Sequence, residues 1–243
     1  SWWDEATKGV RGVSHENERA VNFAARQLLD AMSPANFIAS NPEILKRTAT
    51  TGGQNLIMGM QNYYDDLRSA TLNELQPMPE AYRIGETIAA TPGKVVFRNR
   101  MFELLQYTPT TDKVHKTPLV IFPPWINKFY IMDLKEKNSL IKWIVDQGYT
   151  LFVVSWVDPD ERYADAGMDT YVEEGYLTAI QQVKDITGED QINAVGYCIA
   201  GTTLGLTLSL MSKRKDSSIK CGTFFTTMTD FSDQGEFGVF LDD

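Results

Sequence analysis

The residues with the strongest chemical signature surround Cys198, one of two cysteines in the chain. An apolar, β-branched run that includes Ile192 and Val195 meets the pattern Gly-x-Cys-x-x-Gly at 196–201, and a helix-like stretch follows at 199–211. This order of strand, sharp turn and helix predicts a nucleophile elbow in which cysteine replaces the usual serine. The two glycines allow strand and helix to approach closely around a strained backbone position.

A helix that begins at Ile199 aims its first amides at an anion beside the Cys198 sulfur. We expect this to favour a thiolate and to provide one half of an oxyanion hole. The alternative is a buried structural cysteine beside an ordinary strand–helix turn. The placement between a good strand and a good helix favours the catalytic interpretation.

The elements that must position this cysteine alternate between strands and helices. We predict strands at 94–98, 102–108, 117–122, 150–156, in the run before Cys198 and at 219–227, and helices at 138–147, 170–186 and 199–211. The first two strands form a hairpin, and the alternation predicts a mostly parallel sheet with right-handed crossovers. The fold class is therefore α/β, with an α/β-hydrolase core that carries the elbow at the carboxyl end of a strand.

The loop that follows the strand at 117–122 is the expected source of the second oxyanion donor. In this fold the donor comes from the loop after an early central strand. Here that loop is 123–130, stiffened by Pro123 and Pro124, and the N–H groups of Trp125 and Ile126 are candidates. A rigid aromatic loop that only packs is the alternative.

The front third of the chain shows a helical pattern. Amphipathic spacing predicts a helix at 16–32, two short helices near 34–39 and 42–49, and a longer one at 54–69. We place a helical N-terminal domain with its linker at 1–91 and the core at 92–243, with 71–93 as the irregular connection. Trp2, Trp3, Tyr63 and Tyr64 are expected to pack within the helical domain, with a contact surface as the alternative.

Composition limits the classes of function. The chain has 243 residues, 43% of them hydrophobic, and a net charge of −9, which argues against a nucleic-acid partner. Two cysteines exclude a disulfide framework and favour a reducing cytoplasm. We expect neither a signal peptide nor a membrane-spanning segment.

A cysteine nucleophile of this type requires a histidine base and an acid that orients it. The α/β-hydrolase order is nucleophile, acid, histidine, but His15 and His115 both precede Cys198, and we interpret both as exposed structural residues. Acidic residues after the elbow are Asp230, Asp233, Glu236, Asp242 and Asp243. Asp230 lies just past a strand, a position where some hydrolases keep their catalytic acid, but we expect it to be a loop or capping residue. We expect the chain to be truncated before the last core strands, with its base in a segment beyond Asp243.

Several segments resemble polyhydroxyalkanoate synthases, the poly(3-hydroxyalkanoate) polymerase family. The similar segments are 123–134, 138–143, 155–160, 196–202 and 230–240. The long front region and Tyr197 before the cysteine are similar to the single-subunit class I enzymes, whose substrates are short-chain. Ala200 differs from the family's frequent glycine, and Val157, Asp158 and Met168 differ from its frequent Arg-Asn and Trp.

The resemblance implies a cysteine acyltransferase that polymerises (R)-3-hydroxyacyl-CoA and releases coenzyme A. Cys198 would carry the growing chain, and the N–H groups of Ile199 and Ile126 would bind the oxyanion. The family's catalytic Asp and His would lie outside this chain, and Asp230 matches a family motif but not the catalytic acid. No cofactor or metal is implied. The implied partners are acyl-CoA, the polyester chain and its granule surface, a second subunit in a homodimer, and the remaining C-terminal segment of the protein, in a cytoplasmic, granule-associated setting.

Two alternative functions stay open from the residues alone. The first is a cysteine-dependent α/β-hydrolase such as a thioesterase or a dienelactone-hydrolase-like enzyme, which uses the same elbow. The second is a non-catalytic fragment for granule binding or dimerisation built on the front helices. Product analysis and the relative labelling rates of Cys198 and Cys221 distinguish these alternatives.

Overall fold

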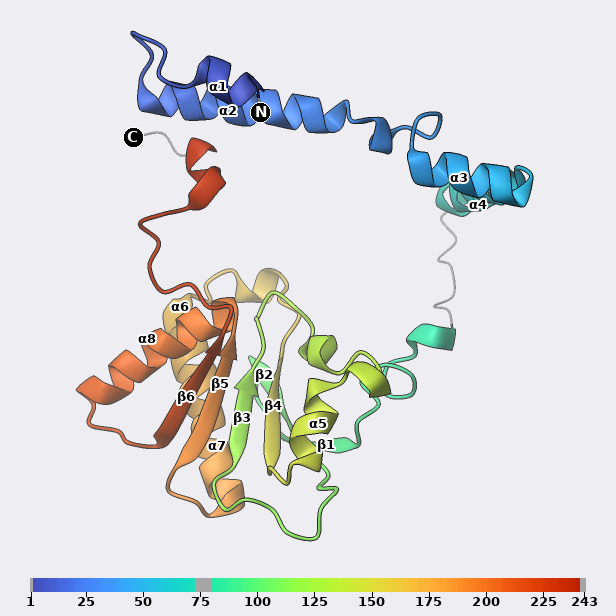
Figure 1. The fold of residues 1–243 in the computed structure, drawn as a ribbon. Coiled ribbons are helices and arrows are strands. Elements are labelled where there is room, and N and C mark those ends of the chain that lie inside the picture. The colour runs from blue at the N-terminus through green and yellow to red at the C-terminus, as the bar shows by residue number, and fades with distance from the viewer. Residues whose placement is uncertain (1, 73–79, 241–243) are drawn as a thin grey trace. The chain divides into compact units, whose positions relative to one another are not determined.

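The protein divides into two compact units in a computed structural model that describes residues 2–72 and 80–240, except for three side chains (Trp3, Asp4 and Ala81). One unit is Ser1–Pro77 with Phe231–Asp243, and the other is Met78–Asp230. Figure 1 shows the helices and strands that make up each unit.

The sheet unit, Met78–Asp230, differs at both ends from the predicted core at 92–243. The segment before residue 92 packs on the sheet unit, since the Ala89 N–H donates to the Asp133 carbonyl at 2.8 Å. The segment after 230 packs on the helical unit, where Glu236 pairs with Arg26 and the ring of Phe240 meets Phe23 edge-on. The chain thus returns to its first unit after completing the second.

The second unit is built on a six-stranded sheet with the order β1-β2-β4-β3-β5-β6. Its strands are β1 (Gly93–Arg98), β2 (Phe102–Tyr107), β3 (Leu119–Phe122), β4 (Leu151–Trp156), β5 (Ile192–Tyr197) and β6 (Ile219–Phe225). β1 pairs antiparallel with β2 and β2 with β4, while the three pairs made by β4, β3, β5 and β6 are parallel. The leading hairpin, the mostly parallel sheet and the elbow after β5 confirm the predicted α/β-hydrolase core.

Helices cover both faces of this sheet, which explains why its central strands carry unbroken apolar runs. In β4, residues 151–154 are all fully buried. One face packs against α7 and α8 and the other against α5 (Figure 1). The helices of this unit are α5 (Leu140–Asp146), α6 (Met168–Thr170), α7 (Thr178–Thr187) and α8 (Ile199–Lys213).

The helix predicted at 170–186 is not a regular α-helix. Between α6 and α7 the chain forms a π-helical segment, η6 (Tyr171–Leu177), and π-helical turns occur often at functional sites. Within it, a Cβ at Gly175 would lie 2.8 Å from the Trp156 ring, so the glycine allows this ring to press against the backbone. Helical periodicity alone carried no signal for this change of pitch.

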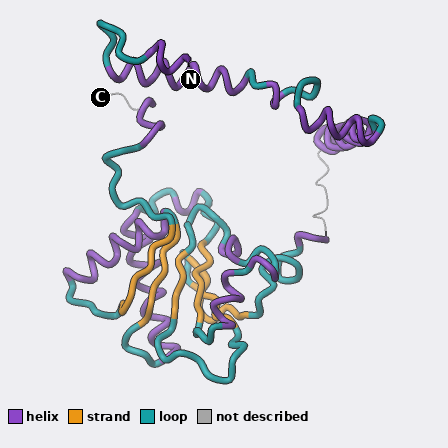
Figure 2. Tube along the Cα trace, in the orientation of Figure 1, coloured by secondary structure: helices purple, strands orange, loops and turns teal. Residues whose placement is uncertain are grey.

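The first unit consists of helices joined by loops, with no strand among its described residues (Figure 2). Its helices are α1 (Trp2–Thr7), α2 (His15–Ala31), α3 (Pro42–Thr51) and α4 (Gln54–Leu72), with short 3₁₀ turns at Pro34–Asn36 and Gly235–Phe240. Ser14 caps α2 and Asn41 caps α3 by accepting from N–H groups of the first turn. The four predicted helical regions are confirmed, although the one near 34–39 is a single 3₁₀ turn.

The expected packing of the front aromatic residues is wrong. Trp2, Tyr63 and Tyr64 are 78%, 64% and 65% exposed, and the Trp3 side chain lies outside the described residues. α1 packs on α2 and α3 on α4, and a pair of helices leaves most of each apolar face in solvent. Accordingly, α2, α3 and α4 contain no buried residue.

Among the described helices, none has both the length and the apolar character that crossing a bilayer requires.

Candidate active site

The turn between β5 and α8 has the geometry of a nucleophile elbow. Cys198 has φ 57° and ψ −127°, a conformation that non-glycine residues rarely adopt, and it is exposed. Its N–H donates to the Phe225 carbonyl of β6 at 2.9 Å, and its carbonyl accepts from the Gly201 N–H at 2.9 Å. These two bonds hold the strained residue between the sheet and the first turn of α8, and the thiol projects from that turn.

The two glycines of the motif are required by close packing. A Cβ on Gly196 would lie 2.5 Å from the Gly201 Cα, and a Cβ on Gly201 would lie 1.9 Å from the Thr227 Oγ1. Both distances are far below van der Waals contact, so neither position admits a side chain unless the backbone or Thr227 moves. The expectation that these glycines bring strand and helix together is confirmed.

Two backbone amides are candidates for an oxyanion hole. Ile199 begins α8, and Ile126 follows β3, whose last residue Phe122 lies beside Gly196 in the sheet. The carboxyl ends of β3 and β5 are therefore adjacent, and both amides lie at the same edge as Cys198. Neither N–H has a hydrogen-bond acceptor among the described residues. The arrangement meets the topological requirement for an oxyanion hole, while the roles of Ile199 and Ile126 stay predictions.

The loop that carries Ile126 is tied to helix α8 and to the end of β4. The Trp125 indole N–H lies 3.4 Å from the Thr203 Oγ1 in α8, and the Trp156 indole N–H donates to the Pro123 carbonyl at 2.8 Å. The loop is thus held to the elbow helix on one side and to the end of β4 on the other. These bonds explain how a loop with two prolines is kept in one position.

Asp133 anchors the far end of the same loop. Its carboxylate is only 2% exposed and accepts from the Thr91 N–H and Oγ1 at 3.2 and 2.7 Å, and from the Ser139 hydroxyl. Ser139 also caps α5 by accepting from the Lys142 N–H at 2.8 Å. This buried group, which sequence reasoning missed, joins three segments behind the loop at 123–130.

Tyr176 contacts the buried side of the elbow, and sequence reasoning missed this residue too. Its fully buried hydroxyl donates to the Ala200 carbonyl at 2.8 Å, and its ring stacks on Phe122 at 4.2 Å between ring centres. Burial raises the pKa of Tyr176 far above its usual range, so the hydroxyl stays a donor at all ordinary pH values. No sequence signal marked this tyrosine, because the contact joins residues 24 positions apart.

Within the sheet unit, His115 lies away from the edge that carries Cys198. His115 precedes β3 at the opposite edge, where its N–H donates to the Gly148 carbonyl at 2.7 Å and its ring meets Tyr149. His15 is the first residue of α2 in the other unit. Both are exposed, as expected for structural histidines.

The candidate acids after the elbow have different positions. Asp230 is the exposed last residue of the sheet unit. Asp233 accepts from the Gly235 N–H at 2.8 Å and so caps a turn, while Glu236 pairs with Arg26. Asp242 and Asp243 lie outside the described residues. The structure therefore gives Asp233 and Glu236 structural partners in the helical unit.

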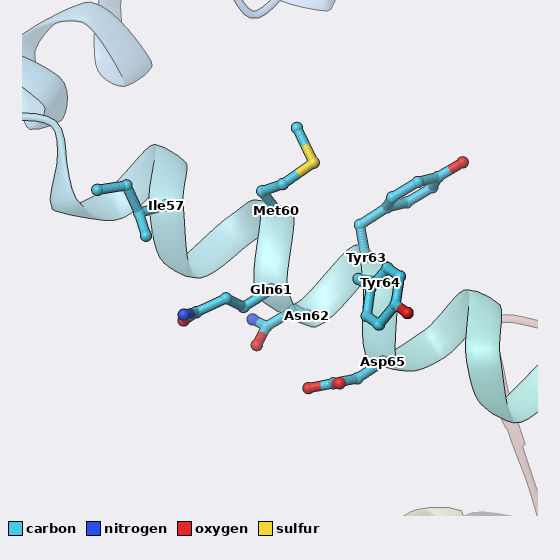
Figure 3. A pocket seen from close by; sticks show the side chains of 7 residues that line it. All are labelled: Ile57, Met60, Gln61, Asn62, Tyr63, Tyr64 and Asp65. Atoms are coloured by element: carbon cyan, nitrogen blue, oxygen red, sulfur yellow. The ribbon is translucent and has the colours of Figure 1, made fainter.

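Hollows also occur on the helical unit, and the one on α4 lacks the features of a reaction site. It has a volume of about 770 Å³ and is lined by seven residues of α4 alone, among them Met60, Tyr63 and Tyr64, whose side chains point outward from a single helix (Figure 3). A ligand site normally brings polar groups together from several elements. Within the described ranges, no cluster of three or more His, Cys, Asp or Glu has the arrangement of a metal site.

Comparison with known proteins gives consistent matches. A family model described as poly-beta-hydroxybutyrate polymerase (PhaC) N-terminus matches residues 1–144. The chain is 45% identical to a poly(3-hydroxyalkanoate) polymerase of Methylorubrum extorquens over all of its length and 40% of the relative's. It is 41% identical to a poly(3-hydroxyalkanoate) polymerase subunit PhaC of Cupriavidus necator over 94% of this chain and 38% of that one.

Solved structures give weaker similarities. An α/β hydrolase from a lagoon-sediment metagenome has 14% identity and a TM-score of 0.40, with coverage of 56% of this chain and 52% of that one. A fungal esterase from Rhizomucor miehei has 15% identity and a TM-score of 0.45, with coverage of 70% and 54%. The chain spans about 40% of the length of the curated polymerases it matches. Since the family model covers more than half of the sequence, the chain belongs to the poly-beta-hydroxybutyrate polymerase (PhaC) N-terminus family.

Proposed function

We propose that this chain carries the nucleophile of a polymerase that joins (R)-3-hydroxyacyl groups from coenzyme A thioesters into a polyester. The observation that carries the proposal is Cys198, held at positive φ at the crest of the elbow and exposed at the edge where the Ile199 and Ile126 amides lie. The polymerase names of the relatives support the reaction class. Because the chain spans about 40% of their length, the activity belongs to the longer protein.

In the first step the Cys198 sulfur, as thiolate, attacks the carbonyl carbon of the acyl thioester. The carbonyl oxygen takes up negative charge and accepts hydrogen bonds from the Ile199 and Ile126 N–H groups. The bond to the coenzyme A sulfur then breaks, and coenzyme A leaves as a thiolate that takes up a proton. The product is an acyl group attached to Cys198 through a thioester.

In the second step the 3-hydroxyl oxygen of another acyl unit attacks the carbonyl carbon of this acyl-cysteine. A base removes the hydroxyl proton, an ester forms, and the bond to the Cys198 sulfur breaks. We place the histidine base and its orienting aspartate in the part of the polymerase outside this chain. A thioester suits the intermediate because its exchange with another thioester is nearly isoenergetic and it reacts slowly with water.

The polyester grows into a granule, and the working form is a dimer in the cytoplasm whose surface meets that granule. No resident cofactor is needed, since acyl-CoA is consumed as substrate.

The test uses the full-length polymerase with 3-hydroxybutyryl-CoA. Cys198→Ala is expected to abolish coenzyme A release and the acyl adduct seen by intact-protein mass spectrometry. Cys221→Ala, which changes the other exposed cysteine in β6, is the matched control and is expected to retain both. Coenzyme A release near the normal rate from the Cys198 variant would contradict the assignment, and free hydroxyacid in place of polymer would identify a hydrolase.

A further inference from the structure

A cavity of about 350 Å³ lies beside the oxyanion loop and has no role in the steps above. Its walls come from the loop after β3, from the end of β4 with the loop that follows it, and from η6. The lining residues that matter most are Trp125, Ile126, Trp156, Val157 and Tyr171. Because β3 and β4 are parallel neighbours, the cavity opens at the edge of the sheet that carries Cys198.

The two tryptophans make their part of the cavity wall apolar, because their indole N–H groups are bonded within the fold. The indole N–H of Trp156 is used by the Pro123 carbonyl, and that of Trp125 faces the Thr203 hydroxyl. Both rings lie against Tyr171, at 5.6 and 5.2 Å between ring centres. The tryptophans therefore offer ring faces to the cavity, while their polar atoms are engaged within the fold.

One polar group on the wall is free to bind a ligand. The Tyr171 hydroxyl has no hydrogen-bond partner among the described residues, and partial burial, with a smaller effect of Tyr163, raises its pKa. It is therefore a neutral donor at pH 7 that suits a carbonyl, ester or hydroxyl oxygen. At the rim, Lys128 lies 3.7 Å from Asp158, so the charges balance and the mouth does not favour the phosphates of coenzyme A.

The size of the cavity exceeds that of one short acyl group. It has the volume of about 12 water molecules at ~30 Å³ each. A four-carbon 3-hydroxyacyl group has about six non-hydrogen atoms and would fill about half of it at the same volume per atom. The space therefore suits a longer acyl chain or two linked short units.

The cavity lies close enough to the elbow for one acyl chain to be attached to Cys198 and to enter the cavity. Ile126 belongs to the cavity wall, and its N–H is a proposed donor to the oxyanion on Cys198. β3 lies between β5 and β4, so the cavity begins one strand away from the nucleophile, at about 5 Å per strand. A carbonyl held by the Ile126 amide thus has its carbon chain at the mouth of the cavity.

We propose that this cavity, lined by Trp125, Trp156, Val157 and Tyr171, binds the 3-hydroxyacyl chain attached to Cys198 and sets the acyl length that the enzyme accepts. The inference rests on the proposed function of Cys198. Val157, as part of the wall, limits the length of the chain, and Tyr171 donates to one of its oxygens.

The test is made in the full-length polymerase with 3-hydroxybutyryl-CoA and 3-hydroxyhexanoyl-CoA. Val157→Phe fills the cavity and is expected to lower kcat/KM for the six-carbon substrate relative to the four-carbon one by about 10-fold or more, the scale of discrimination in an apolar pocket. Val114→Phe adds the same ring at an exposed position before β3, at the opposite edge, and is expected to leave the ratio unchanged. Tyr171→Phe is expected to raise KM for both substrates.

Val157→Ala provides a second test if the phenylalanine of Val157→Phe disturbs folding. This variant enlarges the cavity and is expected to raise kcat/KM for the six-carbon substrate relative to the four-carbon one. Unchanged ratios in folded Val157→Phe and Val157→Ala would overturn the inference while leaving the role of Cys198 intact. If Cys198→Ala releases coenzyme A as fast as the parent enzyme, the proposed function fails instead. The two failures are therefore separate observations.

Discussion

Gly201 and Gly205 lie four residues apart in α8 and predict opposite responses to the same substitution. A Cβ on Gly201 would meet the Thr227 Oγ1, Cγ2 and Cβ at 1.9, 2.8 and 2.9 Å, whereas a Cβ on Gly205 would meet nothing within 4 Å. Rotation of the Thr227 side chain moves its oxygen and methyl but not its Cβ. Part of the clash therefore persists in every rotamer, and the backbone of the elbow must shift.

The magnitudes follow from helix propensity and overpacking. Alanine is favoured over glycine inside a helix by about 1 kcal/mol, so Gly205→Ala is expected to stabilise the fold by about that amount. Overpacking costs about 1–3 kcal/mol, and the 1.9 Å contact places Gly201→Ala at the upper end. After the same propensity gain, Gly201→Ala is expected to lower the free energy of unfolding by about 2 kcal/mol.

Thermal unfolding of the full-length protein, followed by circular dichroism and tryptophan fluorescence, measures this difference. The shift is about 2–4 °C per kcal/mol for 150–250 residues and smaller for a longer protein, so the two Tm values, which reflect a difference of about 3 kcal/mol, should differ by up to about 6 °C. Thr227→Gly in the Gly201→Ala background removes all three contacting atoms and should recover part of the loss, with a coupling of about 1 kcal/mol or more. Gly201→Ala with the stability of Gly205→Ala would refute the packing argument.

Three further predictions concern groups behind the elbow and on the surface. Tyr176→Phe removes the hydrogen bond to the Ala200 carbonyl and should lower the free energy of unfolding, measured by urea titration, by about 1 kcal/mol. Alkylation of Cys198 should also be slower. Unchanged values of both would show that the bond is unimportant. Asp133→Ala leaves the Thr91 and Ser139 donors without their acceptor and should cost about 1–3 kcal/mol, read as the urea midpoint beside that of Asp146→Ala at an exposed site. A hydrogen bond from Arg100 lowers the pKa of Glu174, so its contribution to stability is present above the ordinary pKa of 4.5 and is lost as pH falls through the folded value. Glu174→Gln should therefore show a smaller fall in Tm between about pH 5 and pH 3 than the parent protein, and an equal fall would contradict the assignment.

Much of the sheet unit could be predicted because its signals are local. The run at 150–156 contains apolar residues on both faces, and Gly-Tyr-Cys-Ile-Ala-Gly interrupts a strand with small residues before a helix. These patterns depend on neighbours in the chain, so the elements and the elbow were found close to their observed limits. The π-helical segment η6 was missed, because no pattern of neighbouring residues distinguished its pitch from that of an α-helix, and the Trp156 ring that lies against Gly175 comes from another element.

The front helices show where local patterns lead to a wrong expectation. Amphipathic spacing located α2 and α4 correctly, but it also led us to expect a packed interior around Tyr63 and Tyr64. Periodicity identifies the apolar face of a helix without showing whether another element covers it. In the described residues these tyrosines remain more than half exposed.

The sequence by itself determined the nucleophile candidate, the kind of turn that holds it, and the alternation of strands and helices that requires a layered α/β fold. Only the tertiary structure decided which distant groups support that turn. Thr227 packs against Gly201, Tyr176 donates to the Ala200 carbonyl, and Trp125 ties the loop at 123–130 to α8. The reason is that a strained residue such as Cys198 persists only when the surrounding residues hold it in place. Those residues come from distant parts of the chain and become neighbours only when the strands have paired and the helices have packed.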